Sequence, residues 1–270
     1  MRAAIFLPVV LACACLGQAS DPDPVELMRK SAAPRKANEA KVRQYAFRER
    51  QITRAVDKNG KESGSHSETW DVIGLEGSTY RRLVLKNDEP LPRKEEKREE
   101  ERLQKEAERR RKETPEQRRN RLFSFSYTFT LDMDRAADIY DLRYTGEEKI
   151  AGRGAWVIEG LPKPGFRPAN DQEKEAQNYC LKVWLDQEDM VVSFMELEII
   201  TDRSRMQKGS VIRVDSFRND DRVWLAKQAN IDFNIRYFKL LGTHGDSVIT
   251  YSDYHKFQAE SKILDVTLEQ

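Results

Sequence analysis

The chain has 270 residues, with 47 Lys and Arg against 46 Asp and Glu, and a formal net charge of +1 at pH 7. This balance argues against a general nucleic-acid binder, which would carry a clear basic excess. The charge is uneven, however: residues 93–121 hold 13 Lys and Arg against 9 Asp and Glu, so a mildly acidic body carries one basic-rich insert.

The first twenty residues have the pattern of a cleavable signal peptide. Arg2 is the only charge ahead of an apolar run that ends at Leu16, and small residues at Gly17 and Ala19 suit signal-peptidase cleavage. The run is shorter than the roughly 20 apolar residues that a membrane-spanning helix needs. We therefore expect residues 1–20 to be removed and the mature chain to be exported, either to the periplasm or out of the cell.

A lipid anchor is the alternative to this simple export. Val10-Leu11-Ala12-Cys13 loosely matches a bacterial lipobox, and acylation at Cys13 or Cys15 would tether the mature chain to a membrane. After cleavage behind Ala19, only Cys180 would remain, so no internal disulfide could form. We expect Cys180 to be a strand residue in an apolar stretch.

Residues 21–41 are expected to form an N-terminal helical or linker segment. A β domain follows, with its first part at 42–92 and its remainder at 122–270, and the charged insert at 93–121 between them. The segments with strand character are 45–52, 68–73, 79–85, 123–129, 138–148, 155–161, 180–186, 190–200, 210–217, 228–237, 248–254 and 261–268. Short turns between many of them favour an antiparallel meander of about ten strands over a βαβ arrangement. Segment 123–129 could instead continue a helix that enters from residue 118.

The charged insert is predicted to be an exposed helix. From Arg93 to Glu113 only Leu103 and Ala107 are apolar, so the helix has no apolar stripe to bury. Three acid-before-base pairs with a spacing of four support it: Glu101 with Lys105, Glu106 with Arg110 and Glu108 with Lys112. We expect a solvated, self-supporting helix, with a dedicated binding element as the alternative.

The C-terminal strands alternate apolar and polar residues. In residues 228–237 the apolar positions share one face, which is typical of an antiparallel sheet covered on one side. Candidate residues for the dry wall of a cavity are Trp184, Met195, Leu197, Ile231, Phe233, Ile235 and Tyr237. A tryptophan within a strand also fits an ordinary core position.

Catalytic, metal-binding and cofactor motifs are not found in the sequence. His66, His244 and His255 have no second ligand at helical metal-site spacing, and no phosphate-binding glycine loop or Gly-x-Ser-x-Gly motif occurs. The acidic pairs Asp186 with Asp189 and Asp220 with Asp221 lie in predicted turns, where they satisfy backbone donors. We therefore expect no enzyme activity, no metal, no cofactor and no nucleic-acid partner.

Several short motifs together resemble a known superfamily. They are Gly146–Ile158 followed by Pro162-Lys163-Pro164, then Lys182–Asp186, Trp224–Lys227 and Tyr251–Phe257. Their order resembles the outer-membrane lipoprotein-sorting proteins and their regulator relatives, the LolA/LolB/RseB-like superfamily, and most of all its uncharacterised secreted members. The charged insert lies outside this pattern, and no arginine here matches the family's cavity-gating arginine.

The resemblance implies a curved antiparallel sheet, an incomplete barrel, with a few helices on its concave side. It also implies a non-enzymatic envelope protein that binds an acyl chain, a lipid or a lipoprotein in the cavity. An envelope protein or a membrane surface is a further expected partner. The alternative is a periplasmic interaction or sensor module with a filled core, in which the charged helix binds the partner.

Overall fold

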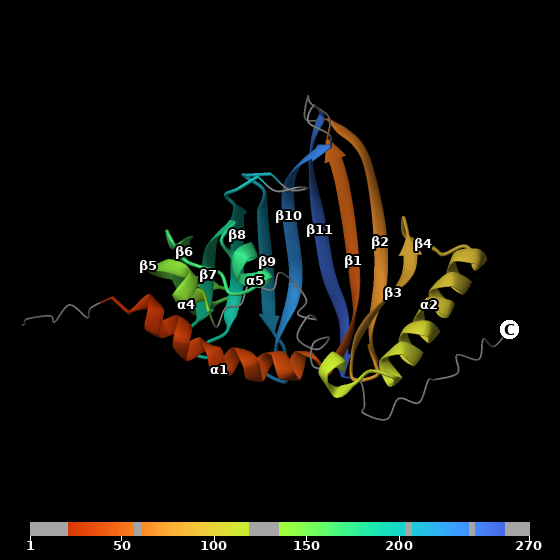
Figure 1. Cartoon of the computed structure of the whole chain (residues 1–270), viewed down its shortest axis with the longest axis horizontal. Helices are drawn as coiled ribbons and strands as arrows, with labels where there is room; N and C mark the ends of the chain where they lie inside the picture. The colour runs from red at the N-terminus through yellow and green to blue at the C-terminus, as the bar shows by residue number, and fades with distance from the viewer. Residues whose placement is uncertain (1–20, 57–60, 119–134, 203–206, 238–240, 257–270) are drawn as a thin grey trace, which may run out of the picture.

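The computed structural model describes residues 21–56, 61–118, 135–202, 207–237 and 241–256. Over these ranges the protein is one open antiparallel sheet with few helices (Figure 1). The strands are β1 (Tyr45–Val56), β2 (Glu62–Leu75), β3 (Ser78–Lys86), β4 (Glu89–Pro90), β5 (Tyr140–Ile150), β6 (Arg153–Pro162), β7 (Tyr179–Asp186), β8 (Val192–Ile199), β9 (Val211–Arg218), β10 (Trp224–Tyr237) and β11 (Leu241–Lys256). The helices are α1 (Pro24–Val42), α2 (Arg93–Arg111), α4 (Ala136–Ile139) and α5 (Asp171–Ala176).

The predicted fold class, a large antiparallel sheet with a few helices and a charged helical insert, is confirmed. Several boundaries differ from the predictions. The helical turn α4 includes Asp138, so β5 begins only at Tyr140, and β10 and β11 begin earlier than predicted, at Trp224 and Leu241. The predicted strands at 123–129 and 261–268, and the predicted signal peptide, lie outside the described residues. In the described ranges, no helix is long and apolar enough to cross a membrane.

The strands follow the order β4-β3-β2-β1-β11-β10-β9-β8-β7-β6-β5. Strands that follow one another along the chain are therefore paired, except for β4 and β5, which form the two edges of the sheet. The first strand, β1, pairs with the last, β11, along a seam inside the sheet. The seam runs from Tyr45 opposite Lys256 to Val56 opposite His244. Because β1 and β11 lie about 200 residues apart along the chain, this seam is the long-range pairing on which the sheet depends.

Two of the hairpins turn through residue pairs with left-handed backbone. Glu76-Gly77 joins β2 to β3 with φ of 45° and 82°, and Ala151-Gly152 joins β5 to β6 with φ of 49° and 84°. Two-residue turns with positive φ at both positions match the twist of antiparallel strands, and glycine adopts that conformation without steric cost. Both pairs therefore fix the register of their hairpins.

Helix α1 covers one part of the sheet, on the side that we call the helix-bearing face. Figure 1 shows α1 running past the ends of the strands, from the β5 side towards the start of β1. Its Leu27 and Met28 are buried against the main hydrophobic cluster, to which α4 and α5 also contribute Ile139 and Ala176. This cluster holds the small helices and strands β5–β9 together by burying apolar area, at about 25 cal/mol per Å².

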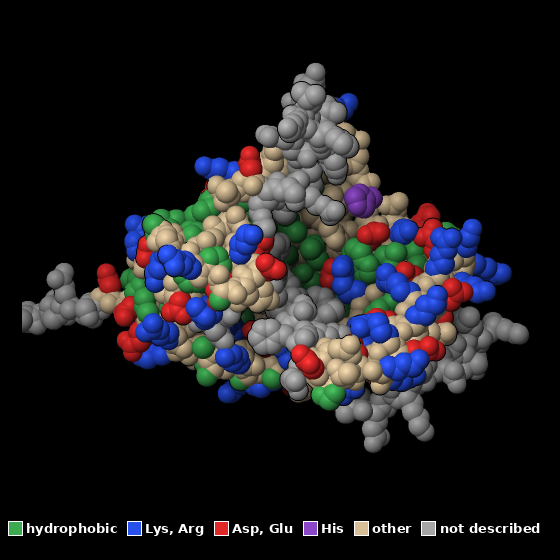
Figure 2. Space-filling view, viewed as in Figure 1, with side chains coloured by type: hydrophobic (Ala, Val, Ile, Leu, Met, Phe, Trp, Pro, Cys, Tyr) green, Lys and Arg blue, Asp and Glu red, His purple; other side chains and the backbone are tan. Residues whose placement is uncertain are grey.

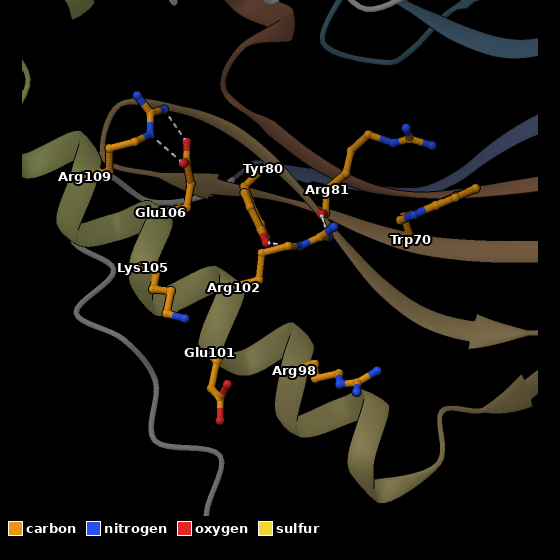
Figure 3. A pocket seen from close by; sticks show the side chains of 9 residues that line it. All are labelled: Trp70, Tyr80, Arg81, Arg98, Glu101, Arg102, Lys105, Glu106 and Arg109. Carbon is orange, nitrogen blue, oxygen red and sulfur yellow. Dashed lines mark hydrogen bonds and ion pairs between the residues drawn. The ribbon is translucent and has the colours of Figure 1, made fainter.

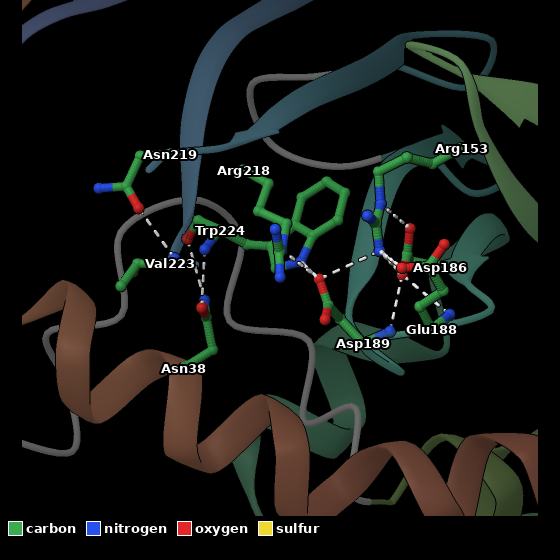
Figure 4. Close-up of polar contacts among 9 residues, drawn as sticks. All are labelled: Asn38, Arg153, Asp186, Glu188, Asp189, Arg218, Asn219, Val223 and Trp224. Atoms are coloured by element: carbon green, nitrogen blue, oxygen red, sulfur yellow. Dashed lines mark hydrogen bonds and ion pairs between the residues drawn. The ribbon is translucent and has the colours of Figure 1, made fainter. Parts of the chain in front are cut away.

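The other end of α1 is held by hydrogen bonds (Figure 4). Asn38 accepts from the backbone amide of Trp224 at 2.8 Å and donates to its carbonyl oxygen at 2.9 Å. The Trp224 indole donates to Asp189, which also pairs with Arg218 and Arg153. The start of β10, the β7–β8 turn and α1 are thereby joined in one network.

Asp186 is the buried centre of that network. Its side chain is 1% exposed and accepts two hydrogen bonds from Arg153, at 2.6 and 2.8 Å. Burial alone would raise the pKa of this carboxyl, but the bonds from Arg153 and from the backbone amides of Asp189 and Glu188 hold the pKa below its ordinary value. Asp186 therefore acts as a structural anion in its turn, as the sequence predicted.

Helix α2 lies along the edge strand β3 and is more than a solvated helix. The backbone amide of Leu83 donates to Glu99, while Arg102 donates to the carbonyl oxygen of Arg81 and Arg110 to that of Thr79. The side chain of Arg110 is only 4% exposed. The expectation of a self-supporting helix was wrong, because α2 attaches through polar side chains to strand backbone rather than through apolar area.

Candidate ligand-binding face

The two faces of the sheet differ in chemistry. Side chains alternate between faces along each strand, and directly paired residues share a face. The face opposite to the helices carries ion pairs between neighbouring strands, including Arg48 with Asp71 at 3.0 Å and Arg54 with Asp246 at 2.7 Å. Apolar residues gather instead on the helix-bearing face, which is therefore the candidate for binding a hydrophobic ligand.

Four of the predicted cavity residues lie together on the helix-bearing face. Leu197 is 1% exposed within the main cluster, and Met195 and Ile231 pack against it while partly buried. Phe233 lies two positions after Ile231 in β10, and its ring lies over Gly245 of the neighbouring strand. These residues form the apolar row that alternation in β8 and β10 predicts.

Of the other three predicted residues, Trp184 alone has a described side chain, and it is not part of this group. Trp184 pairs with Phe194 and belongs to a separate small cluster on the opposite face, with Val157. Ile235 and Tyr237 lie in β10 opposite Thr243 and Leu241, but their side chains lie outside the described set.

The middle of the helix-bearing face is hollowed. Figure 2 shows hydrophobic side chains at the bottom of a hollow between the part covered by α1 and the part bordered by α2. In this region the large residues of β10 face small ones of β11, with Ile231 opposite Ser247 and Phe233 opposite Gly245. Ile249, opposite Ala229, continues the apolar row. The Phe233 ring lies over Gly245 and Ser247 is buried, so both small residues of β11 are covered.

A short polar row borders the apolar one. Gln51 donates to the Ser247 hydroxyl at 2.8 Å, and the Thr53 and Ser247 hydroxyls lie 3.2 Å apart. These groups satisfy one another across the β1–β11 seam, so they add little cost to a dry face. The hollow is therefore apolar on its β10 side and polar on its β1 side.

A buried acid and an arginine lie beyond the polar row. Glu49, with a side chain 5% exposed, forms an ion pair with Arg81. Burial raises the pKa of Glu49, and the pairing with Arg81 offsets only part of that effect. The Arg81 guanidinium lies 4.1 Å from the centre of the Trp70 ring, in cation–π geometry. The face thus changes from apolar to charged over a few strands.

Glu49 and Arg81 were not predicted as site residues. One signal was available, since Glu49 stands two residues after Phe47 in β1, a position whose side chain points to the helix-bearing face. A charge at such a position needs a partner, but nothing in the sequence identifies that partner as Arg81 of β3.

Solved structures resemble this chain at low sequence identity. No family model and no curated protein matches the chain. A DUF1329 family protein from Desulfovibrio piger is a structural neighbour, with a TM-score of 0.40, 15% identity, and coverage of 89% of this chain and 96% of that one. A putative outer membrane lipoprotein-sorting protein domain from Vibrio parahaemolyticus is similar with a TM-score of 0.39 and 12% identity. The match covers 88% of this chain and 94% of that one. A LolA superfamily protein from Nitrosomonas europaea is similar with a TM-score of 0.32 and 13% identity. The match covers 89% of this chain and 96% of that one.

Proposed function

We propose that this chain is a non-enzymatic, exported envelope protein that binds a hydrophobic ligand on its helix-bearing face. The ligand class is an acyl chain, a lipid or a lipoprotein. The observation that supports the proposal is the apolar row of Ile231, Phe233 and Ile249 on the helix-bearing face, the face on which Figure 2 shows hydrophobic side chains at the bottom of a hollow. Ligand pockets are mostly apolar with a few polar groups at one side, and this hollow has that composition.

Titration of a fluorescent fatty acid into delipidated, refolded protein tests the proposal. We expect saturable micromolar binding, weakened about fivefold or more by Ile249→Ala, because the truncation removes apolar contact worth about 0.8 kcal/mol per methylene. Val248→Ala is the matched control, since Val248 is the next residue of β11 and faces the opposite side. Equal weakening by both variants would place the ligand elsewhere, and absence of binding would remove the proposal.

One observation favours the alternative of an interaction module with a filled core. Under α1 the cluster is tightly packed, with Ile158, Val183 and Leu185 each fully buried, so that part of the helix-bearing face has no room for a ligand. A protein that binds no fatty acid, yet is pulled down with an envelope protein in an α2-dependent way, would fit this alternative.

A further inference from the structure

A second pocket lies between α2 and the edge of the sheet, with a volume of about 680 Å³. The rings of Trp70 and Tyr80 form its sheet side (Figure 3). Five basic residues line it, against two acidic ones, Glu101 and Glu106. The basic residues are Arg81, Arg98, Arg102, Lys105 and Arg109.

The acidic residues do not neutralise this pocket. Glu106 accepts hydrogen bonds from Arg109 and Arg110, which lower its pKa to about 2, so its charge is already compensated. In Figure 3 Glu101 extends away from Tyr80 and Arg81. The predicted pair of Glu101 with Lys105 is not among the ion pairs of the described residues, whereas Glu106 with Arg110 forms at 2.6 Å.

Two cationic groups, Arg98 and Lys105, keep their binding capacity, while Arg81 is already paired with Glu49 through a terminal nitrogen. Across the part of the chain that the structure describes, neither Arg98 nor Lys105 lies within ion-pair distance of a carboxylate, and both are exposed. The Nε of Arg81 is buried and has no hydrogen-bond partner there. A buried donor without an acceptor is costly, and an anionic oxygen is the strongest acceptor it could receive.

The pocket adjoins the apolar hollow. Trp70 pairs with Glu49, and Glu49 pairs with Tyr251, which packs against the main cluster near Ile249. A path across β2, β1 and β11 therefore leads from cations and aromatic rings to the apolar row. A basic and aromatic surface that continues into an apolar one matches a molecule with a charged head and an apolar chain.

We propose that the pocket under α2 binds the anionic head, a carboxylate or a phosphate, of an amphiphile whose chain lies in the hollow. Arg98 and Lys105 contact the head, and the Arg81 guanidinium and the Trp70 ring border the pocket on the sheet side. The assignment rests on the proposed function, because it names the class of hydrophobic ligand as anionic.

Calorimetric titration of the mature chain with dodecanoate, dodecyl phosphate and uncharged dodecanol tests the assignment. We expect the anions to bind more tightly than dodecanol, and Arg98→Gln/Lys105→Gln to weaken the anions about fivefold, or about 1 kcal/mol, without changing dodecanol. The matched control is Lys94→Gln/Lys97→Gln, which removes two charges from the same helix outside the pocket and should leave all three affinities unchanged. The tighter anion identifies the head as carboxylate or phosphate.

Two results would overturn the assignment in distinguishable ways. If all three compounds bind equally and the pocket variant matches the control, the ligand is not held by its charge, while the proposed function stands. If none binds, the proposed function fails, and inorganic phosphate then tests the pocket alone. Phosphate binding that the pocket variant abolishes would keep the anion site, and no phosphate binding would reject it.

Discussion

Glu49 and Glu106 show how the surroundings of a carboxylate decide its contribution to stability. Burial raises the pKa of Glu49 above its ordinary value, whereas hydrogen bonds from Arg109 and Arg110 lower that of Glu106 to about 2. The fold therefore favours the protonated form of Glu49 and the ionised form of Glu106. Glu106 stabilises the protein above the ordinary glutamate pKa, and this contribution is lost as the pH falls towards 2.

Glu49→Gln tests the opposite dependence of stability on pH, which is expected at Glu49. A raised pKa means that the folded protein holds a proton that the unfolded chain releases, so the wild type loses stability as the pH rises from the ordinary glutamate value through the raised one. Glutamine does not titrate, so the variant should gain stability relative to the wild type as the pH rises above the ordinary glutamate pKa. Urea unfolding over this rise in pH measures the difference, and a difference independent of pH would contradict the raised pKa.

Gly245 is the residue on which the position of Phe233 depends. A Cβ built there would lie 2.3 Å from the carbonyl oxygen of Arg54 and 2.8 Å from the Phe233 ring. We expect Gly245→Ala to destabilise the protein by about 1–3 kcal/mol through overpacking. Gly64 is the matched control, because Ala55 of β1 pairs with Gly245 on one side and with Gly64 on the other. A Cβ at Gly64 would have open space around it, so Gly64→Ala should be neutral or stabilise the protein by about 0.5 kcal/mol. Thermal melting of both variants compares them, and equal losses would show that Gly245 is not crowded.

At the scale of single residues, the sequence predicted correctly which side chains share a face of the sheet in strands where apolar and polar residues alternate over many positions. Ile231 and Phe233 share the face expected from alternation in β10, as do Met195 and Leu197 in β8. Trp184 was grouped with them by size and apolar character. Its neighbours Val183 and Leu185 are the ones that face the main cluster, and so Trp184 faces the other side.

At the scale of elements, α2 was predicted as a helix, but its attachment was not. Acid–base spacing within a sequence indicates a helix, and one of the three expected pairs forms. The attachment of α2 uses the backbone of β3, including the amide of Leu83 and the carbonyl oxygen of Thr79. Every residue has such groups, so no side-chain pattern could show that α2 binds them.

Arg110→Met tests the attachment of α2. Arg110 donates to the carbonyl oxygens of Leu75 and Thr79 and to the Ser78 hydroxyl, and the methionine would leave these buried acceptors without their donor. We expect a loss of about 2–4 kcal/mol in unfolding free energy, measured by denaturant titration. Arg111→Met is the control, because Arg111 is 53% exposed and should contribute no more than about 1 kcal/mol through its pair with Glu76. Similar losses in both would mean that α2 contributes only surface charge pairs.

At the scale of the molecule, the meander of hairpins was predictable and the seam was not. Hairpins form between neighbouring segments with recognisable turns such as Glu76-Gly77. The pairing of β1 with β11 joins the first strand to the last, and alternation in either strand is compatible with many partners. The sequence therefore predicted a single sheet but did not reveal which strands form its centre.

The seam also decides how the molecule responds to force. The first residue of β1, Tyr45, pairs with the last residue of β11, Lys256, so force applied between these two strand ends loads one seam pair at a time. Force applied between residues 56 and 256 instead loads the seam pairs together, because these positions lie at opposite ends of it.

In an optical trap, force applied through handles at residues 43 and 256 should open the sheet at low force and separate β1–β4 from β5–β11. Handles at residues 56 and 256 should need a clearly higher force to open it. Equal forces would mean that another part of the molecule yields first. The protein should thus be mechanically weak when force separates the start of β1 from the end of β11, a weakness that no measurement of equilibrium stability would reveal.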